Sequence, residues 1–136
     1  VDCASRVQGQ GDGGGDLVRY ASSPKNLTEV GVKFTDLVDT FQAKEVDRVA
    51  VGVHSVSELL MYGDTEQVYQ FLRVLLAEAQ GLDWPAVAVV DDAAASEQAV
   101  NTLTQPFDGV ITTRRDDDGR AFRYVSESEP SDWVAF

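Results

Sequence analysis

Apolar residues recur along this chain with two different spacings, which predict helices that alternate with strands. The first long helix is predicted over residues 27–43, where apolar residues return at intervals near three and four. Asn26 directly precedes this helix, and Glu29 follows Asn26 by three residues. This spacing indicates that Asn26 caps the start of the helix. The apolar positions are Leu27, Val30, Phe34, Leu37, Val38 and Phe41.

Two continuous apolar runs, Arg48–Val53 and Ala86–Asp92, predict strands of a parallel sheet that is covered on both faces. A short helix is predicted directly after the first run. A second long helix follows, capped by Asp64 and ending at Gly81. Residues 96–106 predict a further helix that Pro106 helps to stop.

The two ends of the chain predict further strands. Val1–Ala4 has the composition of a short strand, and residues 8–16 form a glycine-rich segment that predicts a flexible loop. Near the other end, the acidic turn Asp116–Gly119 separates two strand-like runs and predicts a hairpin. The tail beyond it is polar until Trp133, so its last residues are expected to dock or fray.

These elements predict one α/β domain over residues 1–136, with three layers and a mostly parallel sheet between helices on both faces. The C-terminal hairpin would add an antiparallel arm and make the sheet mixed. Ligands of such sheets bind beyond the carboxyl ends of the strands. The candidate binding residues there are His54, Ser55, Asp91 and Asp92.

The charge balance bears on partners and setting. The chain has 23 acidic and 11 basic residues, a formal net charge of -12, so it would repel the phosphate backbone of nucleic acids. Asp outnumbers Glu by 15 to 8 and Lys is scarce, a composition that resembles proteins of salt-in halophilic archaea. An ordinary acidic protein is the alternative.

Cysteine content and hydropathy bear on the compartment. Cys3 is the sole cysteine, so no intrachain disulfide can form, and a reducing cytoplasm is the simplest setting. A buried packing role suits Cys3 better than that of a reactive thiol. No apolar run reaches the ~20 residues of a membrane helix, and no signal peptide opens the chain. No association with a membrane is therefore expected.

The glycine-rich segment contains a literal G-x-G-x-x-G at Gly9, Gly11 and Gly14. A phosphate loop needs Lys and then Ser or Thr after its last glycine, whereas Gly15 and Asp16 stand there. A dinucleotide fingerprint must open a helix, and the sequence after Asp16 does not predict one. A plain flexible loop is the better interpretation.

The candidate binding residues allow a chemical and a structural interpretation. His54 is the only histidine, without the partners of a zinc site, and Ser55 beside it lacks the G-x-S-x-G turn of a hydrolase nucleophile. A hydrogen-bonded structural histidine is therefore favoured over a catalytic one. One of Asp91 and Asp92 could bind a metal, but capping of the next helix explains at least one of them.

Three segments, "NLTEVGVKFTDLVDTF", "DRVAVGVHSVSELLMYGDTEQVYQFLRVL" and "VNTLTQPFDGVITTR", together resemble the RecA/KaiC-like ATPase superfamily. The match is closer to a group of haloarchaeal proteins described as HTR-like. The resemblance implies a RecA-like core in which Arg48–Val53 is the Walker B strand. The Walker A loop would precede Val1, and the Walker B aspartate corresponds to His54, which cannot supply the anionic oxygen that Mg²⁺ prefers.

The resemblance therefore implies a catalytically degenerate domain with a regulatory or protein-interaction role, related to signal transduction. ATP and Mg²⁺ are not supported as cofactors by this chain alone, and no metal site is predicted. The alternative is an active nucleotide-binding ATPase whose phosphate loop lies upstream of residue 1. A signalling receiver domain fits less well, because no lysine follows Lys44. A protein partner or homo-oligomer is expected, since a missing strand would leave a sheet edge uncovered.

Overall fold

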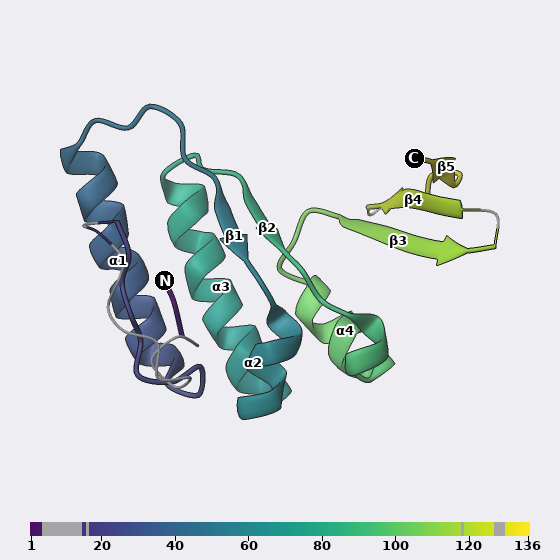
Figure 1. The fold of residues 1–136 in the computed structure, drawn as a ribbon, viewed down its shortest axis with the longest axis horizontal. Coiled ribbons are helices and arrows are strands. Elements are labelled where there is room, and N and C mark those ends of the chain that lie inside the picture. Colours follow the sequence, from purple (N-terminus) through teal and green to yellow (C-terminus); the bar gives the residue numbers. More distant parts are fainter. Residues whose placement is uncertain (4–14, 16, 118, 127–129) are drawn as a thin grey trace.

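Four α-helices, one short 3-10 helix and five strands make up the part of the chain that the computed structural model describes, which is residues 1–3, 15, 17–117, 119–126 and 130–136 (Figure 1). The helices are α1 (Leu27–Ala43), α2 (Val56–Tyr62), α3 (Thr65–Gly81), η1 (Asp92–Ala94) and α4 (Glu97–Thr104). The strands are β1 (Val51–Val53), β2 (Ala86–Ala88), β3 (Val110–Asp116), β4 (Gly119–Val125) and β5 (Val134–Ala135).

The strands form two separate sheets, so the predicted three-layer fold with one mostly parallel, RecA-like sheet is wrong. β1 and β2 pair in parallel, with Gly52 opposite Val87. β3, β4 and β5 form an antiparallel sheet of their own, which stands apart from the helices in Figure 1. The parallel strands are three residues each, and the hairpin strands pair with each other rather than with β1 or β2, so the parallel sheet is two strands wide among the described residues.

One face of the β1–β2 sheet packs on α3, and this contact holds the core. Val68 and Leu72 of α3 are completely buried. They lie in one cluster with Val56 and Leu59 of α2 and with Leu103 of α4. A second cluster joins Val51 of β1 to Leu75 and Ala79 of α3, and Phe34 of α1 packs against it. Both clusters draw on α3, which is therefore the central element of the helical layer.

The predicted helix starts are confirmed by hydrogen bonds at their caps. The side chain of Asn26 accepts from the backbone N–H of Glu29 at 3.1 Å, and α1 begins at the next residue. Asp64 accepts from the N–H of Gln67 at 2.8 Å, while the Gln67 side chain accepts from the N–H of Asp64. This pair is a complete capping box, which satisfies two backbone donors that the helix itself leaves free.

The N-terminal prediction is only partly met. Val1–Ala4 was expected to be a strand, but the described part makes a single parallel bridge between Asp2 and Tyr20. The N–H of Asp2 donates to the Arg19 carbonyl at 2.7 Å. The predicted glycine-rich loop, residues 8–16, lies outside the described residues except for Gly15.

The predicted C-terminal hairpin is confirmed, and the tail docks on it. β3 and β4 pair along their full lengths, from Val110 opposite Val125 to Asp116 opposite Gly119. Gly119 has a φ of 118°, a backbone conformation that favours glycine. β5 then pairs with β4, and the ring of Phe136 packs edge-on against Phe122 with centroids 5.8 Å apart. The end of the chain is therefore a small three-stranded sheet.

Candidate interaction surface

The four predicted site residues lie where β1 and β2 end, as expected. The segment after β1 is tied to the segment after β2 by three backbone donors. The Val89 N–H donates to the Val53 carbonyl at 3.0 Å, and the Val56 N–H donates to the Val89 carbonyl at 2.8 Å. The Asp91 N–H donates to Ser57 Oγ at 2.8 Å. These bonds bring His54, Ser55, Asp91 and Asp92 together at the carboxyl ends of β1 and β2.

Two of these four side chains are engaged in helix capping. Ser55 Oγ accepts from the Glu58 N–H at 3.3 Å and caps α2. Asp91 Oδ1 accepts from the Ala93 N–H at 3.0 Å and caps η1. Both bonds satisfy donors at helix starts, which is the structural role expected for at least one of the two aspartates.

The side chains of His54 and Asp92 are exposed and form no hydrogen bond or ion pair with the described residues. The hydrogen-bonded role expected for His54 is therefore not met. Nor do any three His, Cys, Asp or Glu side chains come together, within the described ranges, in a group that could hold a metal ion. The geometry of this edge offers two exposed polar side chains beside two capping ones, without an arranged nucleophile and base.

The face of the β1–β2 sheet that points away from α3 is uncovered. We call it the open face; its residues are Gly52, Val87 and Val89. A Cβ added to Gly52 would meet no atom within 4 Å, and Val87 and Val89 are 67% and 47% exposed. The prediction that these strands are covered on both faces is thus wrong.

The distribution of side-chain sizes along β2 makes the open face unusual. Ala86 and Ala88 face the helical layer, whereas the larger Val87 and Val89 face outward. Strands normally place their larger apolar side chains on the covered face, because burial of a valine contributes more than burial of an alanine. The open face therefore exposes the larger apolar side chains of β2 to solvent.

The hairpin carries a second exposed apolar surface, which we call the hairpin face. Ile111 lies opposite Tyr124, and Arg115 lies opposite Arg120, so alternation puts these four side chains on the same side of the ribbon. Ile111 and Tyr124 are 67% and 45% exposed, and Phe136 packs on Phe122 from the same side. Sequence reasoning missed this surface, although the period-two pattern of the hairpin was visible.

The other side of the hairpin is covered by a tryptophan. The guanidinium groups of Arg114 and Arg123 lie 4.3 and 4.9 Å from the centroid of the Trp133 ring. Arg114 also pairs with Asp116, with Nε and Oδ2 at 3.1 Å. These contacts use two arginines of the hairpin within its own sheet. Arg115 and Arg120 are exposed and make no ion pair with any residue that the structure describes.

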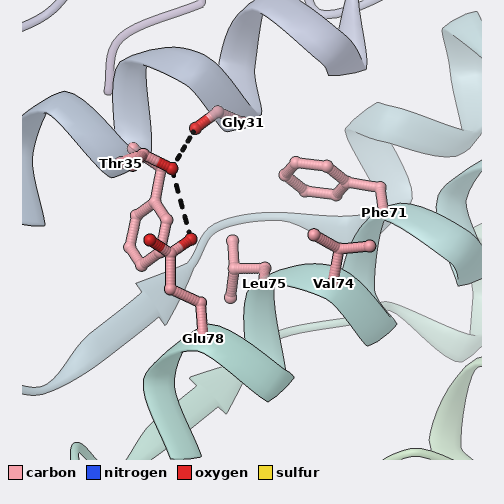
Figure 2. Close-up of a pocket in the computed structure, with 7 residues that line it drawn as sticks. Gly31, Thr35, Phe71, Val74, Leu75 and Glu78 are labelled. Atoms are coloured by element: carbon pink, nitrogen blue, oxygen red, sulfur yellow. Dashed lines mark hydrogen bonds between the residues drawn. The ribbon is translucent and has the colours of Figure 1, made fainter. Parts of the chain in front are cut away.

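A shallow apolar groove lies between α1 and α3, near the core (Figure 2). Phe34, Phe71 and Leu75 contribute to its apolar lining. Thr35 Oγ1 bridges the two helices at its edge, donating to the Gly31 carbonyl and Glu78 Oε2 over 3.3 Å each. Its polar groups are paired with one another, so the groove offers no directed contact to a ligand.

Cys3, in the N-terminal segment, is a titratable group with a shifted pKa. Burial raises the pKa of the Cys3 thiol above its ordinary value of 9.0, because the thiolate loses hydration. The carboxylates of Asp2, Glu29 and Glu58 raise the pKa further, and the N-terminal amine opposes them. At neutral pH the thiol is protonated, which suits the packing role predicted for Cys3.

Comparison with known proteins gives a family without an assigned activity. Residues 1–113 match a family of unknown function (DUF7504), so the match includes the β1–β2 sheet and ends within β3. No curated protein and no solved structure matches the chain significantly. Within the described residues, no helix has both the length and the apolar character needed to span a bilayer.

Proposed function

Since this chain belongs to the DUF7504 family of unknown function, we propose its role from its surfaces: it is a protein-interaction module whose open face docks another polypeptide. The observation that carries the proposal is the outward position of Val87 and Val89 on β2, while two alanines face the core. An apolar sheet face exposed to water is costly, and docking removes that cost.

The role is regulatory rather than catalytic in this proposal, and a reducing cytoplasm is its expected setting. Two of the four candidate site residues, Ser55 and Asp91, have their side-chain oxygens engaged as caps. The imidazole of His54 lacks the carboxylate oxygens that coordinate hard cations such as Mg²⁺. The relationship to the RecA/KaiC-like ATPases and the HTR-like proteins stays a prediction, as does the haloarchaeal origin.

A photo-crosslinking amino acid placed at Val87 tests the docking surface. In cells that express the whole protein, we expect an adduct with a polypeptide from position 87. The matched control places the same amino acid at Val32, which is 62% exposed on α1 and lies on another surface. Absence of any protein adduct from position 87, or equal adducts from both positions, would contradict the proposal.

Calorimetric titration with Mg-ATP tests the catalytic alternative. We expect no saturable heat from the wild-type protein in molar KCl. Saturable binding that His54→Ala abolishes would favour a nucleotide-binding role over the interaction module.

A further inference from the structure

We propose that the polypeptide docked on the open face is the β3–β4 hairpin of a second copy of this chain, an inference that rests on the proposed docking function. Both surfaces are present on each chain. The open face presents Val87 and Val89, and the hairpin face presents Ile111 and Tyr124. Each surface therefore offers the apolar area that the other needs, and burial of both together is favourable.

The charges of the two surfaces are opposite. Four of the 11 basic residues lie on the hairpin, whose turn also holds three aspartates, and two of the four, Arg115 and Arg120, belong to the hairpin face. Arg115 and Arg120 stand directly opposite each other, which is unfavourable for like charges until an anion joins them. Asp91 and Asp92 are exposed at the end of the open face. The aspartates of the hairpin turn form no ion pair with Arg115 or Arg120 among the described residues, so carboxylates of a second copy can pair with these two arginines.

The spacing of apolar and charged positions is the same on both surfaces. Asp91 follows Val87 by four residues, and Arg115 follows Ile111 by four residues. An extended chain rises about 3.3 Å per residue, so each pair spans about 13 Å. β2 ends at Ala88, but the chain continues in an extended form: Val89 is hydrogen-bonded to Val53, and Asp91 has an extended backbone. The distance of about 13 Å therefore also applies from Val87 to Asp91. Ile111 can therefore cover Val87 while Arg115 meets Asp91.

Reciprocal contacts give the assembly its symmetry. Each copy carries one hairpin face and one open face, so two copies related by a twofold axis exchange two identical contacts and close as a dimer. The closed dimer covers both apolar surfaces of both chains, which a single contact would leave half exposed.

Light scattering after size exclusion tests the inference on the full chain at about 0.15 M KCl, where contact ion pairs are only partly screened. We expect twice the 14.8 kDa mass of one chain. Arg115→Glu/Arg120→Glu should reduce the mass to that of a monomer, as should Asp91→Asn/Asp92→Lys, in which Asn keeps the η1 cap. Lys25→Glu/Lys44→Glu, the matched control, changes the net charge as much as the arginine pair but should stay dimeric.

Mixing the two charge variants is the decisive step. In one contact of the mixed dimer, the acidic hairpin of the arginine variant meets the basic open face of the aspartate variant. In the other contact, the unchanged hairpin of the aspartate variant meets the unchanged open face of the arginine variant. We therefore expect the mixture to regain the dimer mass, while each variant alone stays monomeric with unchanged circular dichroism. A monomeric wild-type chain, or a dimer that both charge variants leave intact, would overturn the second-copy inference. A monomer that still crosslinks a different protein from position 87 would overturn it while leaving the docking function standing.

Discussion

The ring of Tyr124 lies so close over Gly109 that a Cβ on the glycine would overlap ring atoms of the tyrosine. Gly109 is the last residue before β3, and Tyr124 lies near the end of β4, opposite Ile111. The contact therefore fixes the hairpin at its base, where the chain enters it from α4. Only glycine leaves room for the ring at this position.

Replacing Gly109 by alanine should destabilise the protein. The new methyl group must displace the Tyr124 ring or the backbone, and overpacking of this kind costs about 1–3 kcal/mol. Urea unfolding followed by circular dichroism measures the loss. In a Tyr124→Ala background the same substitution should cost much less, because the clash is gone. Gly31→Ala is the control: no atom lies within 4 Å of its Cβ, and alanine inside α1 should add about 0.5–1 kcal/mol.

Leu72 is the residue on which we expect the helical layer to depend most. It is completely buried and lies in the cluster that joins α2, α3 and α4. Leu72→Ala should lower the free energy of unfolding by about 2–5 kcal/mol, through lost burial and the cavity left behind. Val74→Ala, two residues along the same helix at a position 68% exposed, should change it by no more than about 0.5 kcal/mol. Similar losses in both variants would contradict the assigned core.

The capping box at the start of α3 should contribute measurably to stability. Asp64→Ala removes the acceptor for the Gln67 N–H and should cost about 0.5–2 kcal/mol in thermal or urea unfolding. Asp64→Asn keeps an acceptor of the same shape, so it should recover most of that loss. If Asn were as destabilising as Ala, charge at the helix end rather than the hydrogen bond would be responsible.

The helices were predictable because their signals are local. Asn26, Asp64 and the apolar spacing within each helix specify starts, ends and buried sides without reference to distant residues. The sheet was not predictable in the same way. The apolar run Ala86–Asp92 is compatible with a strand covered on both faces, and only tertiary packing decides which segments come to cover it.

The sequence predicted where the candidate site lies, but it did not predict the exposed apolar and basic side chains that form the interaction surfaces. His54, Ser55, Asp91 and Asp92 do lie together at the strand ends, as expected for parallel neighbours. The exposed Val87 was missed because the alternation of alanine and valine in β2 indicates two different faces without saying which one the helices cover. Arg115 was missed because its opposition to Arg120 depends on the register of the hairpin, which sequence pattern leaves open within a residue or two.

The shifted pKa of Cys3 predicts slow and strongly pH-dependent alkylation. Burial raises the thiol pKa above its ordinary value of 9.0, so at pH 8.5 the native protein holds less reactive thiolate than an unfolded chain. Iodoacetamide should therefore modify the native protein more slowly than the protein in urea. The midpoint of the native rate profile should lie above pH 9.0, a shift that restricted access alone would not produce.

The same shift sets the sign of a stability effect at alkaline pH. The native state holds its thiol proton more tightly than the unfolded state, so the contribution to stability is complete below the unfolded pKa near 9.0. It is lost as the pH rises through the higher native pKa. Cys3→Ala removes this titration, so wild type and variant should diverge in their loss of stability above pH 9.0. Parallel stability curves for the two proteins across that range would contradict the half-buried position in which the structure places Cys3.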